Sequence, residues 1–138
     1  MTQRTLTIIK PDSVEKGNFG TIIARLEDEG FRVVGIKKLA LSQRLAESFY
    51  AVHRGRPFFK DLVRYMTSGP VYVAALERED AVPHLRKTMG ATDPSKADAG
   101  TIRKEFGESI ERNAIHGSDS PENAQIEIRF FFADSELL

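Results

Sequence analysis

The residues best suited to chemistry lie between Asn113 and Ser120, with His116 at their centre. An imidazole titrates near neutral pH, so it serves as a nucleophile, an acid or a base. Gly117 removes side-chain bulk beside the ring, and Ser120-Pro121 is typical of a helix start, where negative charge is favoured. A structural histidine at the end of a strand is the alternative, and it would be the better interpretation of a histidine without such neighbours.

Glu127 is a second residue that could take part in a reaction, because its spacing places a carboxylate on an apolar stripe. It lies three residues after Ala124 and one before Ile128, which predicts a position on the core-facing side of the last helix. A buried carboxylate needs a partner, and His116 and Ser118 are the natural ones. Bonded to one ring nitrogen, the carboxylate would fix the tautomer and leave the other nitrogen as nucleophile. A solvated position at the edge of the stripe is the alternative.

Three cationic residues complete the set of chemical groups. Lys10 ends a buried strand, so we expect its ammonium group to emerge at an edge of the sheet. Arg86 borders the apolar stripe of a predicted helix, and Arg103 lies in a polar loop. Each alone is typical of a solvated surface charge. Together with His116 they would suit phosphoryl transfer, which depends on positioning and charge neutralisation.

Apolar periodicity and turn residues predict the elements that must position these groups. We expect strands at Thr5–Lys10, Phe31–Leu41, Val71–Leu76 and around Ala114–Ile115. We expect helices over Phe19–Gly30, from Ser42 onward with Leu45, Phe49, Val52 and His53 inward, over Phe58–Thr67, over Asp80–Gly90 and over Ser120–Phe132. The segment Ala91–Arg112 reads as a long loop with one helical turn at Thr101–Phe106. This order predicts an α+β fold, a ferredoxin-like sandwich in which helices cover a four-stranded, mostly antiparallel sheet.

Composition limits the classes of function. With 138 residues, 41% of them hydrophobic and 29% charged, we expect a single domain over residues 1–138. Twenty basic and twenty acidic residues cancel, which argues against nucleic-acid or membrane binding. The chain has no cysteine, no cluster with metal-ligand spacing, and no apolar segment of signal-peptide or membrane-spanning length. We therefore expect a cytoplasmic protein without a built-in metal site.

The segment from Asn113 to Ser120 resembles the active-site signature of the nucleoside diphosphate kinases, and the likeness extends along the whole chain. Arg4–Asp12 is similar to the opening strand of that family. Four further blocks resemble the family in order and spacing: Arg56–Phe59, Thr67–Val71, Met89–Pro94 and Gly100–Arg103. The resemblance implies transfer of a γ-phosphate from a nucleoside triphosphate to a nucleoside diphosphate. It also implies a ping-pong mechanism through phosphohistidine, little base specificity, and a Mg2+ ion carried by the nucleotide phosphates.

The resemblance further implies a role for each matching residue. His116 would be phosphorylated on Nδ1, with Glu127 on the other ring nitrogen and Ser118 supporting that carboxylate. Lys10 would contact the transferred phosphoryl group and the ribose. The remaining positions would hold the terminal phosphates (Arg86, Thr92 and Arg103), bind the sugar (Asn113), position the histidine (Tyr50) and stack on the base (Phe58).

Two features of the sequence predict self-association. First, one domain is not expected to bury all three rings of Phe130, Phe131 and Phe132, so one ring is available for contact with a second copy. The alternative is that Phe130 is simply exposed to solvent on one face. Second, the strand Phe31–Leu41 is long enough to offer an edge to a partner. The resemblance implies a homo-oligomer built from dimers. Because the loop around Pro94 that hexamers use is intact, we favour a hexamer over a tetramer.

Three other functions fit parts of the pattern. A nucleotide- or nucleic-acid-binding module of the same fold would need surface aromatics on its strands and a basic stripe. A catalytically inactive member of the family would be expected to lack His116, Lys10 or Asn113, and all three are present. A phosphohistidine phosphatase would use the same histidine and cations but release inorganic phosphate.

Overall fold

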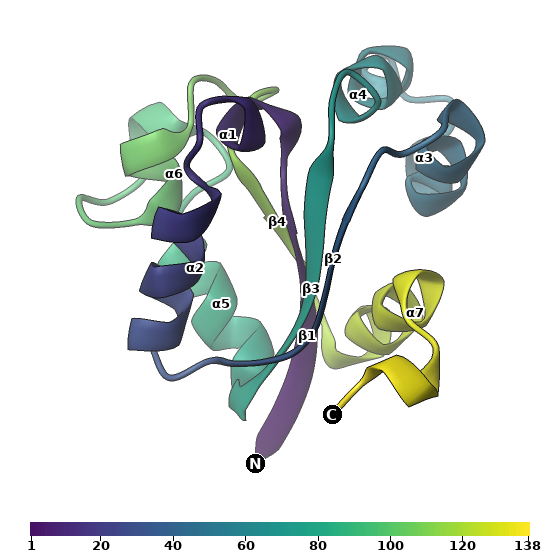
Figure 1. Cartoon of the computed structure of the whole chain (residues 1–138). Helices are drawn as coiled ribbons and strands as arrows, with labels where there is room; N and C mark the ends of the chain where they lie inside the picture. The colour runs from purple at the N-terminus through teal and green to yellow at the C-terminus, as the bar shows by residue number, and fades with distance from the viewer.

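Four strands form one sheet, and helices cover both of its faces (Figure 1). The computed structural model describes residues 1–138. The strands lie in the order β2-β3-β1-β4 and every neighbouring pair is antiparallel. Their bounds are β1 Thr2–Ile9, β2 Arg32–Leu39, β3 Val71–Glu79 and β4 Ile115–Gly117. The predicted α+β fold, a ferredoxin-like sandwich, is confirmed.

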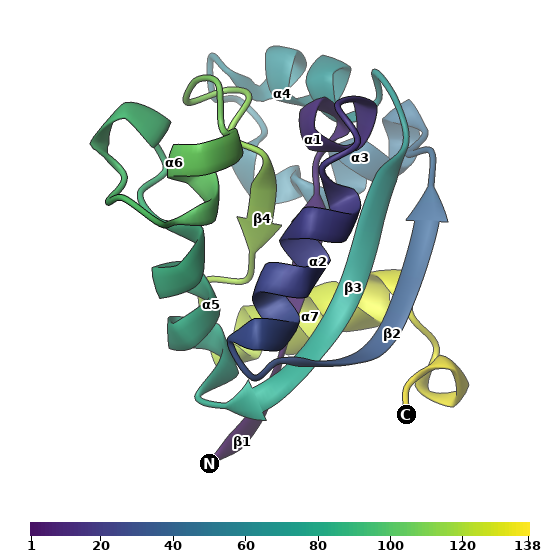
Figure 2. The ribbon, with the colours of Figure 1, turned by 60° about the vertical axis from the view of Figure 1, so that its left-hand side comes forward.

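The helices divide between the two faces of the sheet. Figures 1 and 2 show α2 and α5 on one face and α7, with the α3–α4 pair, on the other. The longer helices are α2 Phe19–Asp28, α3 Gln43–Phe49, α4 Phe59–Met66, α5 Ala81–Met89 and α7 Pro121–Phe131. The short ones are α1 Pro11–Glu15, α6 Ile102–Phe106 and the 3-10 turns η1 Ala51–His53, η2 Pro94–Lys96 and η3 Asp134–Glu136. No helix is long and apolar enough to span a bilayer.

The central strand β3 shows why the sheet is covered on both sides. Val73 and Ala75 pack into one apolar cluster with α3, α4 and α7, whereas Ala74 and Leu76 pack into a second cluster with α2 and α5. Successive side chains of a strand point to opposite faces, so a run without polar residues requires two cores. Burial of each such aliphatic side chain stabilises the folded chain by about 1.5–3 kcal/mol relative to leaving it exposed. The prediction of a central strand is therefore confirmed.

The inward face predicted for α3 is wrong at two positions. Leu45 is 41% exposed and Val52 is 82% exposed, while Ala46 and Tyr50 are buried. The helix ends at Phe49, so residues beyond it follow a 3-10 turn and do not continue the helical stripe. Within the helix, the buried stripe is shifted by one residue from the predicted one.

Lys10 directly follows the last residue of β1, at the edge of the sheet where the strand ends, as predicted. Its side chain is buried and is not a solvated surface charge. Pro11 ends the strand as expected, yet it also begins the unpredicted helix α1, because proline suits the first helical position. Arg103 likewise lies on α6 and is buried, although it was expected in a loop. The helical turn predicted at Thr101–Phe106 is α6 itself.

Candidate active site

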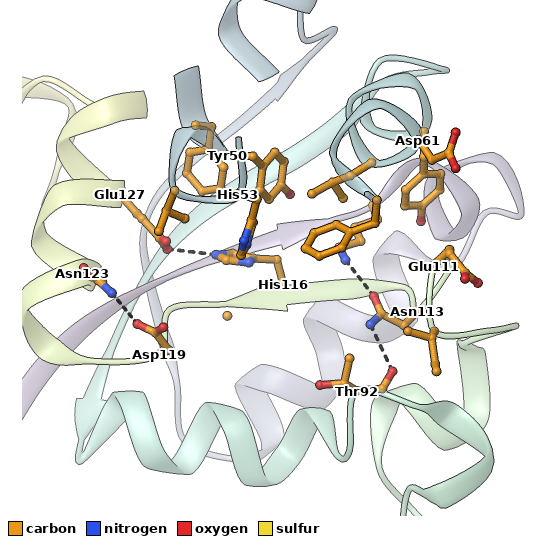
Figure 3. A pocket seen from close by; sticks show the side chains of 18 of the residues that line it. Tyr50, His53, Asp61, Thr92, Glu111, Asn113, His116, Asp119, Asn123 and Glu127 are labelled. Atoms are coloured by element: carbon orange, nitrogen blue, oxygen red, sulfur yellow. Dashed lines mark hydrogen bonds and ion pairs between the residues drawn. The ribbon is translucent and has the colours of Figure 1, made fainter. Parts of the chain in front are cut away.

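The residues that could take part in a reaction line one cavity of about 1000 Å³ (Figure 3). It is lined by side chains from both ends of the sequence and from five helices, so only the folded chain contains it. Every predicted site residue except Ser118 lines it: Lys10, Tyr50, Phe58, Arg86, Thr92, Arg103, Asn113, His116 and Glu127. Ser118 lies buried behind Glu127.

His116 is held by a carboxylate from the neighbouring helix. Its Nε2 lies 2.9 Å from Oε1 of Glu127 (Figure 3). Ser118 Oγ donates to the same oxygen at 2.7 Å. Ser118 Oγ in turn accepts from the Leu6 backbone N–H at 3.3 Å. The predicted orientation of Glu127 toward His116 is therefore confirmed. A carboxylate favours a proton on Nε2, which leaves the Nδ1 lone pair free to attack.

Aromatic rings fix the other side of the imidazole. The Phe49 ring meets His116 edge to face, with 5.5 Å between ring centroids and an interplanar angle of 76°. Tyr50 packs against Phe49 at 5.0 Å, and its buried hydroxyl has no hydrogen-bond partner. Burial raises the pKa of Tyr50, and the charge of Glu127 adds to this effect. Phe49 is thus a contact of the histidine that the sequence did not identify, although it lay on the predicted inward face.

At the opposite end of the cavity, Lys10 and Asn113 form a buried polar pair. Lys10 Nζ donates to Asn113 Oδ1 at 2.7 Å, and Asn113 Nδ2 donates to the Thr92 carbonyl at 3.1 Å (Figure 3). The pKa of Lys10 is lowered to about 8, mainly by burial and also by the Arg103 charge, while the Asp12 charge opposes the shift. The hydrogen-bond partner of the lysine is a neutral amide, and no carboxylate forms an ion pair with it.

Arg103 and Arg86 add two further cations. Arg103 donates to the carbonyls of Gly90 at 3.1 Å and Ile115 at 2.8 Å, and its Nε has no partner. Burial lowers its pKa to about 10, with a smaller contribution from Arg86. None of the ion pairs of the chain includes Lys10, Arg86 or Arg103. Because converging cations without a directly paired carboxylate are costly, this end of the cavity is suited to an anion such as phosphate.

A strained turn directs Asn113 into the cavity. Ala114 has a φ of 74°, and the Ile115 N–H donates to the Asn113 carbonyl at 2.9 Å, which closes a three-residue turn. Such γ-turns with positive φ are rare and costly outside glycine. The Ala114 carbonyl is held by the Lys10 N–H at 2.9 Å. Nothing in the sequence signals this conformation, because alanine has no preference for positive φ.

The third part of the cavity is apolar and exposed. Phe58 precedes α4 and is 46% exposed, with the His53 ring 5.2 Å away. Val52 and Ile110 are also exposed and line the same cavity. Of these residues, the resemblance implied a base-stacking role for Phe58, which stays a prediction, whereas Ile110 was not predicted to line the cavity. An aromatic face with few fixed hydrogen-bonding groups is suited to a planar ring of any kind.

On a fold of this class, a histidine between a cluster of cations and an exposed aromatic ring is an arrangement suited to chemistry on nucleotide phosphates. Comparisons with known proteins define it further. The chain matches the family model described as nucleoside diphosphate kinase over residues 3–137. A nucleoside diphosphate kinase of Anaeromyxobacter sp. (strain K) is 58% identical over 135 residues, which cover 98% of this chain and 92% of the relative.

Solved structures agree with this match. The Aquifex aeolicus nucleoside diphosphate kinase has a TM-score of 0.97 and 46% identity, covering 100% of both chains. The Halobacterium salinarum nucleoside diphosphate kinase, solved in complex with CDP, has a TM-score of 0.96 and 42% identity, covering 100% of this chain and 92% of its own. The chain therefore belongs to the nucleoside diphosphate kinase family, and it is an enzyme of the nucleotide phosphotransferase class.

Proposed function

We propose that the chain transfers the γ-phosphoryl group of a nucleoside triphosphate to a nucleoside diphosphate in two steps through His116. The observation behind this mechanism is the bond between His116 Nε2 and Glu127, which leaves Nδ1 as the free nucleophile. In the first step a bond forms between Nδ1 and the γ-phosphorus, while the bond from that phosphorus to the β–γ bridging oxygen breaks. The electron pair of the broken bond stays on the departing diphosphate.

The second step is the reverse reaction with a different diphosphate. A terminal oxygen of the acceptor attacks the phosphorus, and the electron pair of the P–N bond returns to Nδ1. Glu127 stabilises the positive charge that the ring acquires while it is phosphorylated. One nucleophile serves donor and acceptor in turn, so the kinetics should be ping-pong.

Cationic and polar side chains at the end of the cavity near Lys10 would bind the phosphates and neutralise their charge. We assign Arg86, Arg103 and Thr92 to the terminal phosphates and Lys10 to the transferred group and the ribose, with Asn113 on the sugar. Arginine suits this role because its planar group bonds two phosphate oxygens at once. Phe58 would stack on the base, and Tyr50 would act on His116 through the Phe49 ring that lies between them.

Magnesium would enter with the substrate. The chain places no group of three or more His, Asp or Glu side chains where they could hold a metal ion. Nucleotide phosphates bind Mg²⁺ themselves, and the ion then neutralises charge that develops on their oxygens. The substrates are accordingly the magnesium complexes of nucleoside di- and triphosphates.

We also propose that the chain forms a homo-oligomer of dimers, with a hexamer favoured over a tetramer. The outer edge of β2 has no neighbouring strand, and Phe130 is 37% exposed while Phe131 and Phe132 are buried. Both features leave apolar or unpaired surface for a second copy. Light scattering measures the assembly directly: six chains of 15.5 kDa give 93 kDa and four give 62 kDa. A monomer at micromolar concentration would contradict the proposal.

Two measurements test the mechanism. Treatment with γ-labelled ATP alone should give one acid-labile phosphate on His116, detected by mass spectrometry, and later addition of GDP should move the label into GTP. His116→Ala should abolish both signals. His84→Ala, a histidine outside the cavity, is the matched control and should retain them. Release of labelled inorganic phosphate would instead identify a phosphatase, and an unlabelled protein would identify an inactive binding protein.

A further inference from the structure

A buried pair of residues next to the phosphate-binding end has no part in the mechanism above. Asp12, in the first turn of α1, is 3% exposed, and Tyr65, on α4, is 8% exposed. The Tyr65 hydroxyl donates a hydrogen bond to Asp12 Oδ1. Asp12 Oδ2 and the neighbouring Ser13 Oγ are buried without hydrogen-bond partners. A buried carboxylate with a single neutral partner is costly, so its retention calls for an explanation.

The backbone fixes this carboxylate relative to Lys10. The Lys10 carbonyl accepts hydrogen bonds from the N–H groups of Ser13 and Val14, both at 3.1 Å, so helix α1 begins directly on the lysine. Asp12 therefore cannot move away from Lys10 without unwinding α1. Tyr65 also lines the cavity, and the Arg112 guanidinium lies 5.5 Å from the centre of its ring.

Although Asp12 and Lys10 are two residues apart, they form no ion pair within 4.0 Å. The carboxylate is bonded to Tyr65, and the ammonium group is bonded to the neutral amide of Asn113. The other charged or titratable groups around this part of the cavity include Asp61 on α4, Arg86 on α5, Arg103 on α6, Glu111 and Arg112 in the following loop, His116 on β4 and Glu127 on α7. Asp12 is the group whose negative charge offsets the burial of Lys10.

We propose that Asp12 and Tyr65 are positioning residues for Lys10. The Asp12 charge keeps the lysine cationic inside the cavity, and the Tyr65 hydroxyl keeps that carboxylate from pairing with it. The inference rests on the proposed contact between Lys10 and the transferred phosphoryl group. A direct ion pair would hold the lysine tightly, and each phosphate would have to compete with the carboxylate for it. A carboxylate held out of contact still favours the charged form and leaves the ammonium group free.

The two members of the pair should shift the pH profile in opposite directions. The pH dependence of kcat/KM reports groups of the free enzyme, so an alkaline limb should follow the Lys10 pKa of about 8. Asp12→Asn removes the charge and should move this limb to lower pH by about one unit, with activity at pH 6.5 retained within several-fold. Tyr65→Phe releases the carboxylate toward Lys10, which should raise KM and move the limb to higher pH.

Control variants make the experiment decisive. Glu15→Gln removes one negative charge from the exposed end of the same helix and should leave the limb in place. Lys10→Met should abolish the limb. If both test variants lose activity equally at every pH with an unmoved limb, the pair is structural only and the inference is overturned. If the wild type has no alkaline limb and Lys10→Met leaves KM unchanged, the proposed contact of Lys10 with phosphate fails first.

Discussion

The two ends of the cavity are built on opposite principles. At the cationic end, which we propose binds phosphate, Lys10, Arg103 and Asn113 are buried and each is hydrogen-bonded to the main chain or to another side chain. At the apolar end, which we propose binds the base, Phe58 and Ile110 are exposed and their side chains offer no hydrogen-bonding group. Rigid donors discriminate strongly, because a wrong partner leaves them unpaired, whereas an apolar surface discriminates weakly. Under the proposed function, this difference would let one cavity combine strict recognition of phosphate with tolerance of the base.

The largest effect should come from the phosphate end. Arg103→Met removes donors from the anion site, and we expect kcat/KM to fall by about 10²–10³-fold, equally for ATP, GTP and CTP. Steady-state kinetics with the three donors measure this. Arg44→Met, an exposed position on α3, is the matched control. A loss that depends on the base would show that the two ends are not independent.

Orientation of the nucleophile should have the next largest effect. Glu127→Ala frees the His116 ring, and we expect single-turnover phosphorylation to slow by about 10²-fold without loss of fold. Thermal unfolding measured on the same samples separates misorientation from instability. An unchanged rate would mean that the bond between Glu127 and His116 has no part in the chemistry.

A smaller effect is expected at the base end. Stacking is worth about 1–3 kcal/mol per base, so Phe58→Ala should raise KM by about tenfold for every nucleotide with little change in kcat. In the unaltered enzyme, kcat/KM for ATP, GTP and CTP should differ by less than about 200-fold, the range of loose apolar contacts. Stronger discrimination would identify a base-reading group, and His53, Asp61 and Glu111 are polar residues of the cavity lining to test first.

The smallest effect concerns stability without substrate. Lys10 has a pKa of about 8 in the folded chain, below its ordinary 10.5, so between these pH values the unfolded chain holds a proton that the folded chain has lost. Stability therefore rises with pH in this window. Relative to Lys10→Met, the Tm of the unaltered protein should rise by on the order of 5 °C between about pH 7.5 and about pH 9.5. A constant difference in Tm would contradict the depressed pKa.

Sequence reasoning succeeded where a local pattern determines the geometry. The apolar spacing around Glu127 predicted which face of α7 it occupies, and the two-sided apolar run of β3 predicted a central strand. Sequence reasoning failed where the environment of a residue depends on a partner far away in the sequence. The bond between Asp12 and Tyr65 joins residues 53 positions apart, and no local pattern marks either of them. Likewise Val52 was assigned to an inward face because the end of α3 at Phe49 has no glycine or proline signal.

The pairing of β4 with β1 also determines when the enzyme becomes competent during synthesis. Ser118 meets the Leu6 backbone across 112 positions of sequence, and Asn113 meets Lys10 across 103. Contacts over such distances form after local ones, because a long loop must close first. A growing chain that has exposed Lys10 but not yet β4 has neither the nucleophile nor the lysine's partner. The complete cavity can therefore form only when the last strand has joined the sheet, so a ligand that contacts both ends of the cavity would stabilise the completed fold and not its precursors.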